Sequence, residues 1–377
     1  MQISYLRGRG LGDRAGDGNE AARAHGLVWN VAPICGLPDP DLWRARKRNR
    51  HKFSRQERCY AGALTFEFYR FRFQFRSEGT LYFPPYKSGN IVRGAFGTIF
   101  RKLVCMPDCR DAKSCEVRTT CPYASVFEPR SARGEGPSGL ADWPRSFVFR
   151  AAHLDGDTIG EGENFHFDVH IFDVHDPSLR YFVLAFAQLA RGGLGPGRGL
   201  AELAAVDQLN SGGGTVDRVF EGERFHLGEL AAPICVDLSE APKRVHHARV
   251  RFVTPTELKS EHQVANRPEF GILFGRLRDR ISTLRTLYGP GPLDIDFRAM
   301  GERAAAVRMT QCALKRTDAD RLSSRSGQRH PLGGFVGEVE YQGELSEFVA
   351  YLQLGKWVGV GRQTVWGKGE MEVMELA

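Results

Sequence analysis

The chain has 377 residues, of which 42% are hydrophobic and 26% charged, a composition typical of a globular protein with room for two domains. Lysine and arginine number 52 against 45 aspartate and glutamate, and the net charge of +7 moderately favours an acidic partner. The sequence contains no run of about 18 apolar residues and no signal-peptide core, so we expect a cytoplasmic protein without a membrane span.

Residues 1–60 are expected to form a basic N-terminal extension. Residues 1–20 are rich in Gly, Arg, Asp and Asn and show no hydrophobic periodicity, which predicts that the extension is partly disordered. Residues 41–58 are a run of arginine and lysine with few acids. Such a run suits either a basic arm on nucleic acid or a solvated linker.

Residues 64–76 (LTFEFYRFRFQFR) predict a long strand. From Tyr69 to Arg76 aromatic residues alternate with arginine and glutamine, so one face is expected to be buried and the other to carry cations. Phe66 and Phe68 are out of phase with the later aromatics, which predicts a β-bulge near Tyr69.

The next segment, YFPPYKSGNIVRGAFGTIFRKLVC, predicts an extended turn at two prolines and then a helix over about residues 91–104. Ser88 or Asn90 is expected to cap this helix. Because a helix N-terminus attracts anions, the polar side chains beside it are candidates for contact with a phosphate. These side chains are Tyr86, Lys87 and Arg93.

Four of the eight cysteines fall in one short stretch with the spacing C-x3-C-x5-C-x5-C. They are Cys105, Cys109, Cys115 and Cys121. Thiolates bind zinc tetrahedrally, and four of them complete a structural site. In a cytosolic chain this clustering favours structural Zn²⁺ over disulfides, with reduced free thiols as the alternative.

The rest of the first half predicts strand, strand, helix and strand, at residues 147–152, 164–174, 177–191 and 200–210. With the first strand and helix, the order is βαββαβ, which is typical of a ferredoxin-like domain. We therefore assign a first ferredoxin-like domain to residues 61–210, with the cysteine loop 105–121 inside it. Residues 211–244 are interpreted as a hairpin and connector.

The same order recurs over residues 245–377, which we interpret as a second ferredoxin-like domain. Strands are expected at 245–258, 303–317, 335–343 and 370–376, and helices at 268–289 and from a Ser346 cap. The predicted fold class is α+β, with tandem ferredoxin-like (RRM-like) βαββαβ domains, a cysteine-rich insertion and a glycine-rich C-terminal loop.

That glycine-rich loop, residues 354–369 (LGKWVGVGRQTVWGKG), lies between the last helix and the last strand. Glycines allow positive φ, and successive exposed N–H groups make an anion-binding concavity, while three cations beside them suit a phosphate. The alternative is a tight helix–strand connection. The candidate phosphate-binding residues here are Lys356, Gly359, Gly361, Arg362, Gly367, Lys368 and Gly369.

The chain resembles the CRISPR-associated endoribonucleases of the RAMP superfamily that process precursor crRNA. In the C-terminal half the resemblance lies in Arg321, Ser324, Arg325, Gln328, the Gly-Phe-Val-Gly at 334–337 and the loop 359–369. In the first half, YFPPYKSGNIVRGAFG, the four cysteines and CPYASVFEP resemble the zinc-binding subset of that family. The resemblance covers roughly residues 62–376.

The resemblance implies two tandem ferredoxin-like domains and cleavage within the repeat of a precursor transcript. It implies a reaction without a catalytic metal, in which a ribose 2′-OH attacks the adjacent phosphate and leaves a cyclic phosphate and a 5′-OH. The expected partners are CRISPR repeat RNA and crRNA, with other effector subunits as further candidates. One alternative is a non-catalytic crRNA-binding subunit, and another is a zinc-stabilised interaction protein whose basic surface is incidental.

Many family members carry a catalytic histidine close to the first helix, and this chain has none in that segment. Either another histidine therefore carries out the chemistry or Tyr86 and Lys87 do, and His330 is the first candidate among the histidines. His166 and His170 are the runners-up, although about 13 Å between them on a strand is too far for one shared metal ion. A solvent-facing role is the alternative for each histidine. The arginines expected to bind RNA around His330 are Arg321, Arg325 and Arg329.

Overall fold

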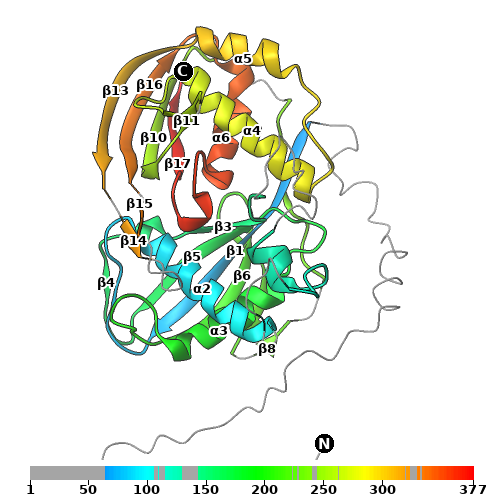
Figure 1. The fold of residues 1–377 in the computed structure, drawn as a ribbon, viewed down its shortest axis with the longest axis vertical. Helices are drawn as coiled ribbons and strands as arrows, with labels where there is room; N and C mark the ends of the chain where they lie inside the picture. The colour runs from blue at the N-terminus through cyan, green and yellow to red at the C-terminus, as the bar shows by residue number, and fades with distance from the viewer. Residues whose placement is uncertain are drawn as a thin grey trace, which may run out of the picture.

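The structure is a computed structural model that describes residues 64–377 except 106–108, 110–114, 130–142, 223, 227–228, 240–243, 262, 319, 323–328 and 332. The N-terminal extension and Arg325 therefore lie outside the described residues. The chain forms two α+β units, each with an antiparallel sheet, in agreement with the predicted α+β class (Figure 1). Among the described residues, no helix combines the length and apolarity needed to cross a membrane.

The first unit places two helices on one face of its sheet (Figure 1). Its strands lie in the order β3-β5-β1-β6, followed by β7 (Thr215–Glu221) and β8 (Arg224–Phe225) from the predicted connector. A short ribbon of β2 (Leu81–Tyr82) and β4 (Thr158–Ile159) lies beside it. The main elements are β1 (Thr65–Ser77), α2 (Ser88–Val104), β3 (Phe147–Arg150), β5 (Asn164–Ile171), α3 (Leu179–Gly192) and β6 (Ala201–Leu209).

The second unit has the strand order β13-β16-β10-β17, with α4 and α6 on one face of the sheet (Figure 1). Counted along the chain, both units place their strands in the order second, third, first, fourth. The main elements are β10 (His247–Thr256), α4 (Phe270–Tyr288), α5 (Phe297–Ala306), β13 (Arg308–Thr317), β16 (Gly334–Gln342), α6 (Val349–Val358) and β17 (Met371–Leu376). Small hairpins are formed by β11 (Lys259–Ser260) with β12 (Gln263–Val264), and by β14 (Asp320–Leu322) with β15 (Arg329–Pro331).

Strand β1 contributes to two hydrophobic cores, one on each face. Phe71, Phe73 and Phe75 point into the core of the first unit under α2 and α3. Phe66 and Phe68 point the other way, into the core of the second unit. Burying each of these rings contributes about 2–3 kcal/mol. The start of β1 also pairs with β9 (Ile234–Asp237), so the predicted connector returns to this strand.

The predicted bulge near Tyr69 is wrong. Residues 69–76 pair with β5 in unbroken register, and the irregularity of β1 lies between Gln74 and Phe75 on the β6 side. The aromatic residues shift from even to odd positions because the second unit covers the opposite face of β1 at its start. Side chains that alternate regularly along the strand can therefore fill one core on each face, and no extra residue is needed.

The second half departs from the sequence expectation at one boundary. The predicted strand 303–317 begins as the end of α5, and β13 starts at Arg308. Asp296 caps α5 by accepting the Ala299 N–H at 2.9 Å. This cap starts a helix that the alanine-rich run of residues 303–306 continues.

The two units meet at the start of α2 and the end of the glycine-rich loop. A Cβ added to Gly89 would lie 2.6 Å from Gly367 Cα, so the two backbones touch. Further along the junction, the Tyr288 hydroxyl donates to the Pro144 carbonyl at 2.6 Å and Arg285 Nε donates to the Thr65 carbonyl at 2.8 Å. These contacts span the units and fix how the loop sits against α2.

Candidate functional site at the junction of the units

The glycine-rich loop folds closely onto its own and neighbouring backbone. Gly359, Gly361, Gly367 and Gly369 all have positive φ, between 71° and 83°. The Val360 N–H donates to the Gly369 carbonyl at 2.8 Å, and a Cβ on Gly369 would lie 1.9 Å from the Val360 carbonyl oxygen. Glycine is therefore required at this position for close approach, which favours the tight-connection interpretation for this part of the loop.

The three predicted cations of the loop have different environments. Lys368 is only 3% exposed, its Nζ donates to the Gly333 carbonyl at 2.7 Å, and burial lowers its pKa. Arg362 is exposed and pairs with Glu257 at 2.6 Å. Lys356 is exposed and lies 5.0 Å from the centre of the Trp357 ring. Lys356 and Arg362 are thus accessible to a ligand, whereas Lys368 stabilises the loop.

The start of α2 already holds a carboxylate from the same chain. Asp155 Oδ1 accepts the N–H groups of Lys87 at 3.1 Å and Ser88 at 2.9 Å. Burial raises the pKa of Asp155, and the hydrogen bonds from Ser88 and Lys87 oppose that rise. The predicted caps Ser88 and Asn90 are therefore wrong, because α2 begins after Lys87 without a side-chain cap of its own. A phosphate at this terminus would have to displace Asp155.

The predicted cation Arg93 is buried within the protein. Its guanidinium lies 4.5 Å from the centre of the Phe127 ring and 5.3 Å from that of Trp366, and the residue is 8% exposed. Stacking of this kind holds α2 against the glycine-rich loop. The structure therefore gives Arg93 a role in joining the two units and does not favour direct contact with RNA.

The C-terminus of α6 is held by the buried His170 and Arg150 and by the half-buried Arg280. His170 Nδ1 lies 2.9 Å from the Trp357 carbonyl oxygen, and Arg150 donates to the same oxygen at 3.0 Å. Arg280 Nε donates to the Val358 carbonyl at 2.9 Å. Cations suit a helix C-terminus, whose carbonyls carry partial negative charge. Burial and the nearby Arg150 lower the pKa of His170 to about 3, so His170 is neutral and structural.

His166, the other runner-up, forms a pair with a histidine that the sequence did not single out. The His153 and His166 rings stack with centroids 4.6 Å apart, and His153 Nε2 lies 2.9 Å from the His166 carbonyl oxygen. Burial and the cation of Arg72 lower the pKa of His166 to about 4. His153 lies in a single turn of 3₁₀ helix, η3 (Ala152–Leu154), and is exposed.

On the same face of the first sheet, two arginines share one acid. Arg70 and Arg72 both donate to Asp168, at 2.6 Å and 2.8 Å. Burial tends to raise the pKa of Asp168, but the two arginines outweigh it and the pKa is lowered. The predicted cationic face of β1 is present, and one acid on β5 partly neutralises it.

His330, the first catalytic candidate, lies in the β14–β15 hairpin. Its backbone pairs with that of Arg321, and Arg329 pairs with Leu322. The described structure covers only the backbone of these residues. The hairpin extends from the second sheet on the side of the first unit (Figure 1). The catalytic role of His330 and the RNA contacts of its neighbouring arginines stay predictions.

The four clustered cysteines approach one another in pairs. The Cys105 thiol is hydrogen-bonded with Cys109, and burial together with Cys121 and Cys109 raises the pKa of Cys105 to about 12. Burial and Cys115 likewise raise the pKa of Cys109. Across the described positions, no three His, Cys, Asp or Glu side chains are grouped closely enough to hold a metal ion. The donor set therefore fits zinc in kind, because four thiols suit that ion, but the described side chains do not form a metal site.

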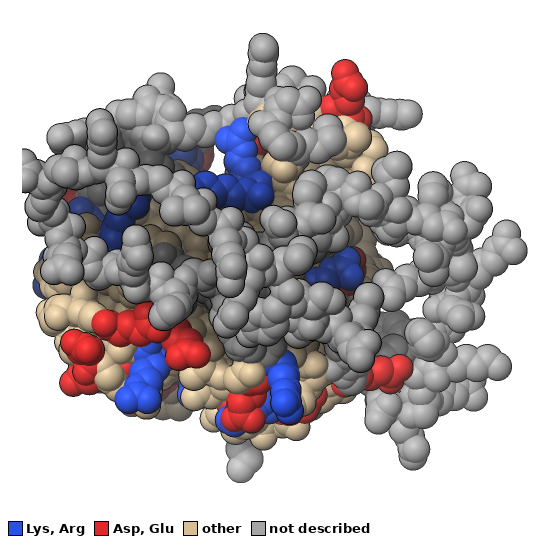
Figure 2. Space-filling view, turned by 90° about the horizontal axis from the view of Figure 1, so that it is seen from below, with Lys and Arg blue, Asp and Glu red and all other residues tan. Residues whose placement is uncertain are grey.

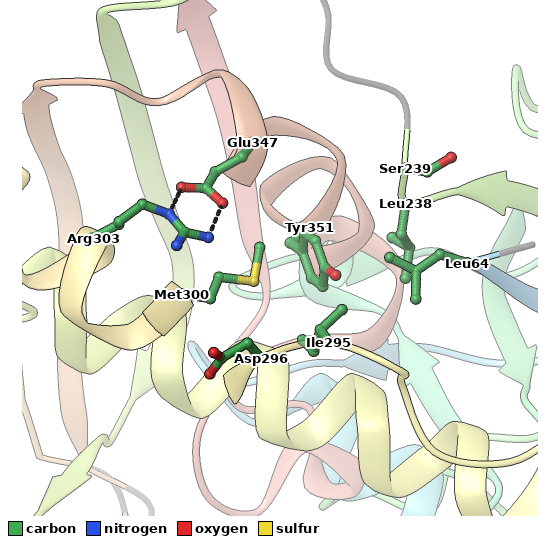
Figure 3. A pocket seen from close by; sticks show the side chains of 9 residues that line it. All are labelled: Leu64, Leu238, Ser239, Ile295, Asp296, Met300, Arg303, Glu347 and Tyr351. Carbon is green, nitrogen blue, oxygen red and sulfur yellow. Dashed lines mark hydrogen bonds and ion pairs between the residues drawn. The ribbon is translucent and has the colours of Figure 1, made fainter. Parts of the chain in front are cut away.

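A cavity of about 270 Å³ lies away from these residues, in the second unit (Figure 3). The ion pair of Arg303 and Glu347 lies on one side of it, and Tyr351 lies near its apolar lining (Figure 3). None of the predicted site residues lines it. Figure 2 shows the molecule from below, where the described acidic and basic side chains are interspersed and form no uniformly basic patch.

Residues 250–371, which run through most of the second unit, match the family model described as CRISPR-associated endoribonuclease Cas6. Residues 65–232 match a model described as an N-terminal domain. The first match supports a CRISPR-associated endoribonuclease of the Cas6 type. It covers the glycine-rich loop and the β14–β15 hairpin, where the sequence resemblance is strongest.

An uncharacterized protein of Archaeoglobus fulgidus is 24% identical over 307 residues, which cover 78% of this chain and 95% of that protein. Among solved structures, a Cas6 product complex is 18% identical with a TM-score of 0.48, covering 82% of this chain and 99% of that chain. Thermus thermophilus Cas6 is 17% identical with a TM-score of 0.44, covering 82% and 98%. These TM-scores are below 0.5, so neither structure transfers a residue role to this chain.

Sequence reasoning missed four residues of the junction, namely His153, Asp155, Arg150 and Glu370. The Asp-Gly pair after the third strand, in HLDGD, is a turn signal that places His153 and Asp155 at a strand end. Their contacts with α2 and β5 join residues far apart in the chain. No local pattern predicts such contacts.

Proposed function

We propose that the protein is a Cas6-type endoribonuclease that cleaves CRISPR repeat RNA in a precursor transcript and releases guide RNA. The match of residues 250–371 to the Cas6 family model carries this proposal. A basic sheet face and the exposed imidazole of His153 near the junction of the units add support, because RNA cleavage needs cations for the phosphate and groups that can transfer protons. We also infer that the two units are tandem ferredoxin-like domains, on the basis of their shared strand order.

In the proposed reaction the 2′-oxygen attacks the adjacent phosphorus, the bond to the 5′-oxygen breaks, and the products carry a 2′,3′-cyclic phosphate and a 5′-OH. No metal ion takes part. His330 serves as an acid or base, with Tyr86 and Lys87 near the start of α2 as helpers. The RNA backbone is bound by Arg321, Arg325, Arg329, Lys356 and Arg362.

The test is cleavage of the protein's own repeat RNA in EDTA, with both product ends mapped. We expect a single cut with the two ends named above, and binding without cleavage when the scissile nucleotide lacks its 2′-OH. His330→Ala should lower the rate at least about 100-fold, whereas His246→Ala, at the outer end of β10, should leave it unchanged. Cleavage of the 2′-deoxy RNA would refute the proposed chemistry.

A non-catalytic RNA-binding subunit is the second candidate function. One observation favours it: Asp155 occupies the first N–H groups of α2, where a phosphate was expected. In that case the intact protein binds both the native and the 2′-deoxy repeat RNA and cuts neither. Other CRISPR effector subunits would then be its expected partners.

We propose a structural Zn²⁺ held by Cys105, Cys109, Cys115 and Cys121. The proposal is supported by the pairwise approach of the thiols and by their number. When bound, zinc would cross-link the end of α2 to the segment before η1 (Tyr123–Phe127). Elemental analysis should find about one zinc per chain, lost in Cys109→Ser, while Cys312→Ser on β13 keeps it. A metal-free wild-type protein would disprove this site.

A further inference from the structure

His153 is held rigidly at the start of α2. The turn η3 that carries it is anchored on one side by Leu154, which is buried in the core of the first unit. On the other side, Asp155 accepts the N–H groups of Lys87 and Ser88. The Phe83 N–H also donates to the Asp157 carbonyl at 3.0 Å. The exposed imidazole is thus fixed beside the segment that carries Tyr86 and Lys87.

The orientation of the His153 ring leaves one nitrogen available as a base. Nε2 lies 2.9 Å from the His166 carbonyl oxygen, and a carbonyl oxygen can only accept a hydrogen bond. The proton therefore lies on Nε2, and Nδ1 of the neutral ring has a free lone pair. Stacking on His166, with 27° between the ring planes, holds this orientation.

His153 also adjoins the glycine-rich loop. Glu370, which directly follows Gly369, interacts electrostatically with His153 and with Arg150. Three segments distant in sequence therefore meet here: η3, the start of α2 and the end of the loop. Tyr86 adds a local signal, because its φ of 59° is unusual for a residue with a side chain and such conformations cluster at functional sites.

Four of the other described histidines are less suited to proton transfer in this region. His170 is enclosed between Phe68 and Trp357. His166 is half-buried and lies under the His153 ring. His246 and His247 are at the outer end of β10, next to Glu344 and Glu340.

We propose that His153 is the general base of the RNA cleavage reaction. The assignment rests on the proposed function. Nδ1 of His153 takes the proton of the ribose 2′-OH, the 2′-oxygen forms a bond to phosphorus, and the bond from phosphorus to the 5′-oxygen breaks. The departing 5′-oxygen receives a proton from His330, the acid in this scheme. His166 is a positioning residue, because its carbonyl and ring orient His153 without touching the RNA.

The test compares His153→Ala and His153→Gln with His175→Ala, a matched change at an exposed loop histidine of the same unit. We expect both His153 variants to lower the single-turnover rate at least about 100-fold, with affinity for the 2′-deoxy repeat RNA within about twofold of wild type. His175→Ala should keep the wild-type rate. Thermal unfolding of each variant verifies that it is folded.

Glutamine can still donate to the His166 carbonyl, so His153→Gln separates orientation from proton transfer. A His153→Gln variant that cuts at the wild-type rate would overturn the base assignment. The pH dependence gives a second readout: the wild-type rate should rise through one ionisation that both variants lack, and added imidazole should partly restore His153→Ala. If wild type cuts its repeat RNA and both variants cut at the same rate, His153 is excluded as the base while the proposed function stands. If wild type does not cut its repeat RNA, the proposed function itself fails.

Discussion

The sheet faces that point away from their own helices carry opposite local charge in the two units, although the strands lie in the same order. On the first sheet, Asp168 is shared by Arg70 and Arg72. One acid between two bases leaves a net positive charge. Asp168 lies on the same strand as His166, two residues further along, and Arg70 and Arg72 lie on the neighbouring strand β1, so the cations and His166 share one face.

On the second sheet the ratio of acidic to basic side chains is reversed. Arg249 is shared by Glu340 at 2.9 Å and Glu375 at 3.5 Å. Its neighbour Arg251 pairs in register with Glu338 and Glu372, which adds two more acids beside one base. A phosphate backbone is therefore attracted to the first face and repelled by the second. The two units therefore share one strand order but differ in the charge on the outer face of the sheet.

The largest expected effect on stability comes from disturbing the contact between the two units at Gly89 and Gly367. In Gly367→Ala, the new Cβ would lie 2.8 Å from Gly89 Cα at a φ of 83°. Steric clash and left-handed strain together should lower the free energy of unfolding by about 3 kcal/mol. Urea denaturation measures this change.

The matched control is Gly162→Ala, which has a similar φ of 79° and nothing within 4 Å. It should lose only about 1 kcal/mol, from backbone strain. Equal losses in the two variants would show that the contact between Gly89 and Gly367 adds nothing to stability.

The charge comparison itself is tested by removing the shared residue on each face. Asp168→Asn leaves two arginines without their common acid in a site that is only 8% exposed, and we expect a loss of about 2 kcal/mol in unfolding free energy. Arg249→Ala removes a residue that is 40% exposed, and should cost at most about 1 kcal/mol. A larger loss of unfolding free energy for Arg249→Ala than for Asp168→Asn would mean that the cluster on the second sheet stabilises the protein more than the cluster on the first.

RNA binding also tests the difference in charge between the two sheet faces. Arg72→Ala should weaken affinity for the 2′-deoxy repeat RNA about tenfold and reduce the salt slope by about one charge. Arg249→Ala should leave both within about twofold, because the acids around Arg249 repel a phosphate backbone. Fluorescence anisotropy over a salt series measures both quantities. A similar loss in the two variants would contradict a path along the first sheet.

Much of the fold could be predicted from the sequence, because alternation in β1 and the apolar stripe of α2 are local patterns. The side-chain contacts at the junction of the two units could not be predicted from the sequence. Asp155 holds the start of α2 from 67 residues away along the chain, and Arg93 resembles a phosphate ligand until its burial is known. The glycines of the loop predicted positive φ correctly, but composition does not reveal that the Val360 N–H donates to Gly369 instead of to an anion.

The smallest effect concerns His170, which lies where Trp357 of the second unit covers one part of the cationic face of the first sheet. Arg150, Arg70 and Asp168 are its charged neighbours, and burial is the main cause of its pKa of about 3. Since a histidine in the unfolded chain has a pKa near 6.5, neutral His170 adds stability above that pH and loses it as the pH falls toward the folded value. Between about pH 7 and pH 5.5 this loss should be about 1 kcal/mol.

Urea denaturation of wild type and His170→Gln at both pH values isolates this contribution. Wild type should lose about 1 kcal/mol more than the variant over this interval, because glutamine does not titrate. His166, whose pKa is lowered to about 4, contributes to the remaining slope in the same direction. Identical slopes in wild type and His170→Gln would mean that His170 accepts a proton in the folded protein as readily as in the unfolded chain, and that the cover over this part of the first sheet is open to water.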